Sequence, residues 1–295
     1  MYSHRLPLVL CCLACLTSPA RAETLQPDAL VVAADADASL PQPPQKQSAQ
    51  PQHYELLEPD GVSLGVAVVS AAGIRLGEDS RTRLVPVLGY EGKRLFLRGL
   101  SGGVHLYARD GLEVNLLFAA RLDNWDARDL DAAGLASRGI DRSLLVDRDP
   151  GAEAGLGLAW KGAAGRLGLE ARTDISNASG GHEVELGYSF AVPAGKGLLA
   201  PGVAVSYWSS KLADYYFGTL PQEEAAGVPS YRPGAEVVPS VSVAYLRALP
   251  GRWRVFGVFK YQWLGDDMVH SPLVEGDRGV PSLFVGVSRS FGGER

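Results

Sequence analysis

The segment ELGYSFAVPAGKGLLAPGVAVSYWSSKLADYYFG, residues 185–218, decides the fold class of this protein. Apolar side chains alternate with polar or small ones, the alternation stops at the turn AGKG (194–197), and it resumes until a pair of tyrosines. A period of two places successive side chains on opposite faces of a strand, and a glycine-containing turn between two such runs indicates a hairpin. The segment therefore predicts two long antiparallel strands, each with one apolar face.

The same period recurs along most of the chain and predicts twelve strands. Tight, glycine-containing turns follow the even-numbered strands, whereas long connections follow all but one of the odd-numbered strands; the exception is a short turn expected at Gly102–Gly103. Short turns at one end and long loops at the other, around an even number of strands, are typical of an outer-membrane barrel. The strands are expected at 62–71, 83–91, 94–100, 103–109, 111–122, 151–161, 165–173, 182–193, 197–209, 237–248, 251–263 and 281–291.

Aromatic side chains favour a membrane barrel over a soluble β-sandwich, which also alternates. They gather near the strand ends on the apolar face, as the aromatic girdles of a membrane barrel require. The fold class expected is therefore all-β: a transmembrane, antiparallel, up-and-down β-barrel of about 12 strands, with short periplasmic turns and long surface loops. The girdle residues are Trp160, Tyr188, Tyr207, Tyr245, Trp253, Tyr261 and Trp263.

The N-terminal segment predicts export. Basic residues precede the apolar run LPLVLCCLACL, and Ala20 and Ala22 form an A-x-A site, so cleavage is expected near Ala22. All three cysteines lie before that site, and acylation of Cys15 is the competing interpretation. The stretch PQPPQKQSAQPQ is too poor in apolar residues to fold alone. The expected organisation is a signal peptide at 1–22, a flexible Pro/Gln-rich linker at 23–59, and an outer-membrane barrel at 60–295.

The composition and motifs give no support for nucleic-acid binding, metal binding or catalysis. The formal net charge is −5 and the sequence has no cluster of Lys and Arg, which disfavours a nucleic-acid partner. The five histidines have neither i, i+4 spacing nor a cysteine companion, so no metal site and no cofactor are expected. GVSLG (61–65) matches G-x-S-x-G, but Ser63 falls within an alternating strand. An acid–base set of His105 with Glu113 or Glu185 is the remaining catalytic alternative to a non-enzymatic protein.

Charged residues on the polar strand faces predict a network inside the barrel. Mixed signs on facing walls of a narrow lumen are expected to pair and to plug it, since unpaired charges there are costly. A selective path or a small-solute pocket is the alternative. Arg172 and Glu185 are expected to be coupled, and the aspartate-rich loop 123–150 is expected to be solvated surface. The predicted network comprises Glu113, Arg166, Glu170, Arg172, Glu185, Arg254 and Lys260, and Glu153, Lys161 and Glu183 share the same face.

Three segments in the last third carry a family resemblance. DYYFG (214–218), YRPGAE (231–236) and YQWLGDDMVHSPLV (261–274) resemble the signature region of the MipA/OmpV family, and the resemblance covers about 60–291. It implies a barrel without established catalytic residues. Some members are described as scaffolds that link a lytic transglycosylase to a peptidoglycan synthase, others as adhesins, immunogens or permeability proteins. The signature residues are Tyr215, Tyr216, Gly218, Ser271 and Pro272.

The resemblance therefore implies a scaffold or interaction protein for peptidoglycan-remodelling enzymes, with a small-solute permeability protein or a surface adhesin as alternatives. The expected partners are outer-membrane lipid and lipopolysaccharide, a lytic transglycosylase and a peptidoglycan synthase. The signature residues fall in surface loops, away from the periplasm, so they are expected to brace those loops. Residues 23–59 and the tight turns are expected to meet periplasmic partners.

Overall fold

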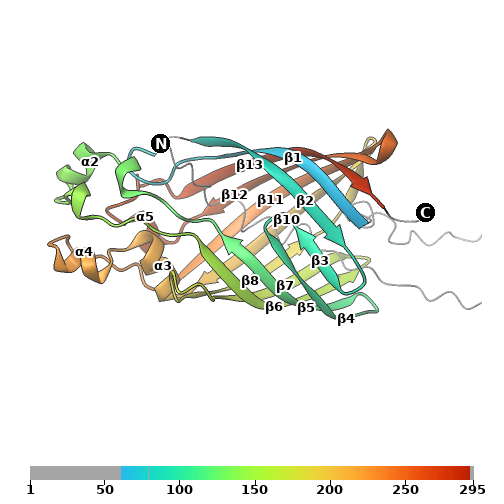
Figure 1. Ribbon diagram of the computed structural model, residues 1–295, viewed down its shortest axis with the longest axis horizontal. Helices are drawn as coiled ribbons and strands as arrows, with labels where there is room; N and C mark the ends of the chain where they lie inside the picture. Colours follow the sequence, from blue (N-terminus) through green and yellow to red (C-terminus); the bar gives the residue numbers. More distant parts are fainter. Residues whose placement is uncertain (1–60, 79, 293–295) are drawn as a thin grey trace, which may run out of the picture.

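The computed structural model describes residues 61–78 and 80–292, which form a closed antiparallel β-barrel (Figure 1). The predicted signal peptide and the linker 23–59 lie outside the described residues. β8 and β9 both pair with β10 and together form one strand of the wall, so the barrel has 12 strands, as predicted. The strands are β1 (Gly61–Ala71), β2 (Arg81–Glu91), β3 (Leu95–Arg98), β4 (Ser101–Arg109), β5 (Leu112–Arg121), β6 (Gly151–Gly162), β7 (Gly165–Asp174), β8 (His182–Ser189), β9 (Val192–Ala194), β10 (Gly197–Trp208), β11 (Glu236–Leu249), β12 (Trp253–Trp263) and β13 (Gly279–Phe291).

The first and last strands close the barrel. β1 pairs with β2 on one side and with β13 on the other, in a register that runs from Val62 opposite Phe291 to Ala71 opposite Ser282. Closure matters because a lipid bilayer offers no water to the backbone N–H and C=O groups of a free strand edge. The up-and-down antiparallel topology expected from the alternating pattern is confirmed.

The two strand faces differ as the period of two requires. On β1, Val66 and Val68 are exposed on the outer face, whereas Ala67 and Val69 are buried inside the barrel. The outward aromatics Trp160 and Trp253 lie near the turn end of their strands. The barrel thus presents an apolar belt to its surroundings and encloses a lumen.

The long loops fold into a cap over one end of the barrel, at the left of Figure 1. Two apolar clusters hold this cap together, one around Leu212, Phe217 and Met268 and the other around Trp125 and Leu135. Among the described residues, no helix is long and apolar enough to cross a membrane. The cap contains η3 (Ala127–Asp129), α2 (Ala132–Ser137), η4 (Arg142–Leu144), α3 (Ser210–Phe217), α4 (Pro221–Ala225) and α5 (Asp266–Val269), while η5 (Pro250–Arg252) lies at the opposite end.

One predicted turn is misplaced. The expected turn at Gly102–Gly103 is wrong, because both residues lie within β4 and the chain reverses at Gly99 and Leu100. Gly99 has φ +63°, a left-handed conformation that glycine adopts without strain. The β3–β4 hairpin is consequently shorter than the others, and β3 has only 4 residues.

Replacing Gly103 should destabilise the barrel. A Cβ atom there would overlap the carbonyl oxygen of Leu116 on the neighbouring strand, so Gly103→Ala should cost about 1–3 kcal/mol through overpacking. The midpoint of urea unfolding in detergent micelles measures this loss. Gly168→Ala is the matched control, because its nearest neighbour is the flexible end of Arg166 at 3.4 Å. Equal stability of the two variants would contradict the close strand contact.

Candidate functional site

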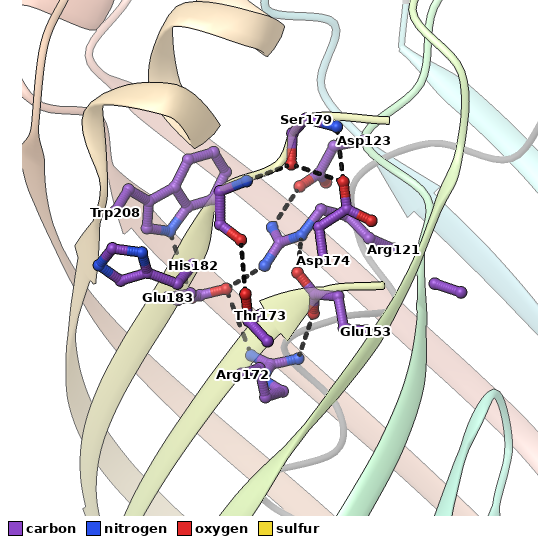
Figure 2. A network of polar contacts seen from close by, with 12 residues as sticks. Arg121, Asp123, Glu153, Arg172, Thr173, Asp174, Ser179, His182, Glu183 and Trp208 are labelled. Atoms are coloured by element: carbon purple, nitrogen blue, oxygen red, sulfur yellow. Dashed lines mark hydrogen bonds and ion pairs between the residues drawn. The ribbon is translucent and has the colours of Figure 1, made fainter. Parts of the chain in front are cut away.

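A buried cation organises the polar side of the lumen next to the cap (Figure 2). Arg121, at the loop end of β5, donates to Asp123 Oδ2 at 2.7 Å and also to Glu153 and Glu183. Its guanidinium carbon lies 5.1 Å from the ring centroid of Trp208. Only 2% of Arg121 is exposed, so these interactions replace the water that the guanidinium loses.

A second arginine extends the network across neighbouring strands. Arg172 on β7 lies 3.3 Å from Glu183 Oε2 and 3.4 Å from Glu153 Oε2. Trp208 Nε1 donates to Glu183 Oε1 at 3.2 Å. Since the two carboxylates are shared by Arg121 and Arg172, the contacts join β5, β6, β7, β8 and β10 into one wall. The arrangement stabilises the paired charges inside the barrel.

The other predicted lumenal residues form smaller sets. Glu113 pairs with Lys161 at 3.0 Å, and Glu185 accepts a hydrogen bond from Ser206 Oγ at 2.9 Å. Arg172 stands opposite Glu183 rather than Glu185 in the β7–β8 register, so the expected coupling of Arg172 with Glu185 stays a prediction. Arg254 and Lys260 face the lumen from β12, and Arg166, Glu170, Glu185 and Lys260 line a narrow cavity of about 30 Å³.

His105 makes contacts other than those in the catalytic alternative. Its Nδ1 lies 2.7 Å from Asn115 Oδ1, and its Nε2 lies 2.9 Å from Glu91 Oε1. Glu91 is also paired with Arg98 at 2.8 Å. Both ring nitrogens of His105 are therefore engaged by lumenal side chains other than Glu113 and Glu185. Within the described part of the chain, no group of three or more His, Cys, Asp or Glu side chains could hold a metal ion.

The cap contains a buried ion pair that the sequence did not reveal. Arg148 pairs with Glu223 through two parallel hydrogen bonds of 2.8 and 2.9 Å, and both side chains are fully buried. The remaining Arg148 N–H groups donate to the carbonyl oxygens of Val146, Tyr215 and Gly218. All five donors of the guanidinium thus have acceptors, and the pair joins loop 122–150 to loop 209–235. In the sequence, Arg148 is one of four arginines in an aspartate-rich loop, and nothing distinguishes it from a solvated residue.

The cap also corrects one expectation about loop 123–150. Asp123 and Asp126 are only 2% and 3% exposed, so the prediction of solvated surface is wrong for these two residues. The loop folds back over the barrel mouth and packs Trp125 against Arg148, whose guanidinium carbon lies 4.6 Å from the ring centroid. Exposed aspartates such as Asp141 agree with the expectation.

The signature residues lie where the cap loops meet. The Tyr216 carbonyl oxygen accepts a hydrogen bond from Trp125 Nε1 at 3.2 Å, and Tyr215 Oη accepts one from the Asp149 N–H at 2.9 Å. Ser271 Oγ donates to the carbonyl oxygen of Phe217. These contacts link loops that are distant in sequence, and the bracing role of the signature stays a prediction. The other two signature residues, Pro272 and Gly218, also lie at contacts between loops. The Pro272 carbonyl oxygen accepts a hydrogen bond from Arg138, and a Cβ atom at Gly218 would crowd the carbonyl oxygens of Asp214 and Tyr231.

The closed wall, the outward apolar belt and the ion-paired lumen beneath a loop cap define an outer-membrane β-barrel protein. Comparison with known sequences narrows the class. Residues 64–291 match the family model described as MltA-interacting protein MipA, so the chain belongs to this family.

Two relatives agree with this class, and one solved structure shows a weaker similarity. The MltA-interacting protein of Escherichia coli (strain K12) is 26% identical over 241 residues, covering 72% of this chain and 92% of the relative. The outer membrane protein OmpV of Vibrio cholerae serotype O1 is 29% identical over 150 residues, covering 50% of this chain and 56% of the relative. The translocator domain of the autotransporter NalP from Neisseria meningitidis has 10% identity and a TM-score of 0.42, covering 78% of this chain and 88% of that chain. The predicted location in the outer membrane is confirmed.

Breaking the cap ion pair should loosen both loops. Glu223→Gln removes the charge that compensates the buried Arg148, and leaving a buried charge unpaired costs about 3 kcal/mol or more. Hydrogen exchange of the amides in loops 122–150 and 209–235 should become faster while strand amides stay protected. Glu224→Gln is the matched control, because this neighbouring side chain pairs with Arg232 at the surface and should have little effect. Unchanged loop protection in Glu223→Gln would contradict the role assigned to the pair.

Asp123 should give the cap a measurable pH dependence. Burial raises the pKa of Asp123 above its ordinary value, although the nearby Arg121 acts in the opposite direction. A carboxyl whose folded-state pKa is raised favours folding below its unfolded pKa, and that contribution is lost as the pH rises through the folded pKa. At neutral pH, the free energy of unfolding of Asp123→Asn should therefore equal or exceed that of the wild type. As the pH falls towards about 4, the free energy of unfolding of the wild type should rise relative to that of Asp123→Asn.

Urea unfolding at a series of pH values checks this expectation. Asp110→Asn, at an exposed turn on the opposite end of the barrel, is the control and should not alter the pH profile. An Asp123→Asn protein clearly less stable than the wild type at neutral pH would show that the ion pair with Arg121 outweighs the cost of burial.

Proposed function

We propose that this protein is a non-enzymatic outer-membrane interaction protein that holds a peptidoglycan-remodelling enzyme, such as a lytic transglycosylase, at the inner face of the outer membrane. The family membership and the name of the Escherichia coli relative support the partner class. The peptidoglycan synthase is a second proposed partner of the same assembly.

The ion-paired lumen beneath the cap is the structural observation that carries the proposal. The lumen holds the Arg121 and Arg172 ion pairs, and the cap packs two apolar clusters over the loop end. Moving a solute through the barrel would require separating buried ion pairs, which is costly in a low-dielectric interior. This favours an interaction protein over the small-solute permeability alternative.

The turn end of the barrel offers a charged surface for a periplasmic partner. β1 begins and β13 ends at this end of the barrel. Exposed basic side chains stand on four of the turns between strands, which suits an acidic protein surface by charge complementarity. These residues are Lys93, Arg94, Arg109, Lys196 and Arg252.

Deleting residues 23–59 should weaken the binding of a purified lytic transglycosylase to the barrel. Changing Lys93, Arg94 and Lys196 to Glu should weaken this binding further and should make it less dependent on salt concentration. Surface plasmon resonance with the barrel in nanodiscs measures both effects. Arg232→Glu in the cap is the matched control, since it changes charge at the opposite end. Heat-modifiable gel migration confirms that each variant is folded.

Two outcomes would contradict the proposal. Capture that is unaffected by the deletion and by the turn variants, but lost in Arg232→Glu, would place binding at the surface loops, as in an adhesin. Steady single-channel openings of the wild type in a planar bilayer at low voltage would favour the permeability protein instead.

A further inference from the structure

Two arginines face outwards from the barrel wall near its turn end. Arg247 on β11 stands opposite Val255 of β12, and Arg289 on β13 stands opposite Trp253 of β12. Directly opposite residues share one face of a sheet, and Trp253 is exposed on the outer face. Both arginines therefore lie on the surface that meets the bilayer, on either side of β12 and at the end opposite the cap (Figure 1).

The surface around the two arginines is apolar. The other outward positions of β11, β12 and β13 carry apolar, aromatic, glycine or proline residues, among them the exposed Val243, Phe259 and Val285. All three strands are hydrogen-bonded to a neighbour on both sides, so the backbone here has its partners within the sheet. A charged side chain on the lipid face of a barrel is unfavourable to a degree that rises with its depth. The two guanidinium groups are thus the polar groups of this surface that need a partner.

Neither arginine finds that partner in a carboxylate of the described residues. The lumenal Arg121 and Arg172 each pair with buried glutamates, whereas no described Asp or Glu side chain pairs with Arg247 or Arg289. A guanidinium that faces lipid is stabilised by water or by an anion. The counter-charge for these two groups is therefore left to the surroundings of the barrel.

Aromatic rings position one of the two guanidinium groups at the membrane interface. The guanidinium carbon of Arg289 lies 5.9 Å from the ring centroid of Trp253 and 5.4 Å from that of Phe291, within the range of cation–π attraction. Outward tryptophans of a membrane barrel lie at the level of the lipid headgroups, and short turns lie on the periplasmic side. Arg252, exposed in the turn before Trp253, adds positive charge at the same rim.

We propose that the outer wall at Arg247, Trp253 and Arg289 binds the phosphate headgroup of an anionic glycerophospholipid in the periplasmic leaflet. A guanidinium offers paired N–H donors that match two phosphate oxygens. A net negative headgroup suits the site better than a zwitterionic one, because no cation of the lipid opposes the arginines. Val255 and Val287 continue the same face towards the middle of the bilayer and contact the acyl chains. The site lies on the wall and is independent of the partner enzyme proposed above.

Native mass spectrometry of the detergent-solubilised barrel tests the proposal. The protein is titrated with phosphatidylglycerol and, in parallel, with phosphatidylcholine of the same acyl chains, and the apparent Kd of the first bound lipid is measured. Arg247→Gln/Arg289→Gln removes both cations of the site. Lys93→Gln/Arg109→Gln is the matched control, because it removes the same charge from the turns that follow β2 and β4.

The wild type should bind phosphatidylglycerol severalfold more tightly than phosphatidylcholine, and Arg247→Gln/Arg289→Gln should bind the two lipids equally. Equal affinities in the wild type would overturn the proposal, because water alone would then solvate the arginines. Loss of the preference in the control variant, with the site variant unaffected, would also overturn it by placing the lipid at the turns.

Glycerol phosphate, added as its ammonium salt, distinguishes a lipid headgroup from a free anion. It should leave phosphatidylglycerol binding unchanged, because it lacks acyl chains, and displacement of the lipid would overturn the proposal in favour of a site for soluble phosphate. Arg289→Gln alone should reduce the lipid preference if the double variant does not fold. Heat-modifiable migration verifies that each variant is folded.

Discussion

The pairing of β1 with β13 closes the barrel, and the remaining features of the structure depend on that closure. Backbone groups in a bilayer must find partners within the protein, and a circular sheet provides them except where a strand is cut short. The pairing is close: a side chain at Gly65 would overlap the Val287 carbonyl oxygen on β13. Closure also creates an interior of limited width, in which every lumenal charge must find a partner of opposite sign. The networks of Arg121 and Arg172 are the consequence of that second requirement.

The cap also contains a buried arginine paired with a carboxylate, but the two residues come from loops instead of strands. In the lumen, Arg121 and Arg172 share two carboxylates, and the pairs join strands that are already hydrogen-bonded. In the cap, Arg148 and Glu223 join two loops that have no sheet to align them, and the planar guanidinium fixes their relative orientation through five directed hydrogen bonds. The lumenal ion pairs therefore add stability to strands that the sheet already aligns, whereas the cap ion pair helps to fix the positions of the two loops. The location of Tyr215 and Gly218, whose carbonyl oxygens both accept from Arg148, is consistent with a signature that maintains the closed cap.

The fold could be predicted from the sequence because a membrane strand carries its burial pattern locally. Alternation such as that of Leu112 and Phe118 against Glu113 and Asn115 needs no knowledge of the neighbouring strand. The same alternation predicted which charged residues face the lumen, but it did not predict which of them pair with one another. Arg172 stands opposite Glu183, and Glu170 stands opposite Glu185, so a shift of two residues in register exchanges the partners. The misplaced turn has a related cause: Gly102–Gly103 is the stronger local turn signal, yet the chain reverses at Gly99. The burial of Asp123 and the pairing of Arg148 depend on packing between distant loops, which the alternating pattern does not encode.

The short β3–β4 hairpin leaves part of β2 without a neighbouring strand in the described wall. Apart from its lumen, the protein offers three surfaces for interaction: the cap, the turn end and the outer wall. On most of the outer wall, hydrogen-bonded strands separate lipid from the interior. Beside residues 81–88 that barrier is one strand edge, and the inward residues behind it include Arg83 as well as Val85 and Val87. Pro86 suits this edge, because proline has no N–H group to leave without a partner on the open side of β2.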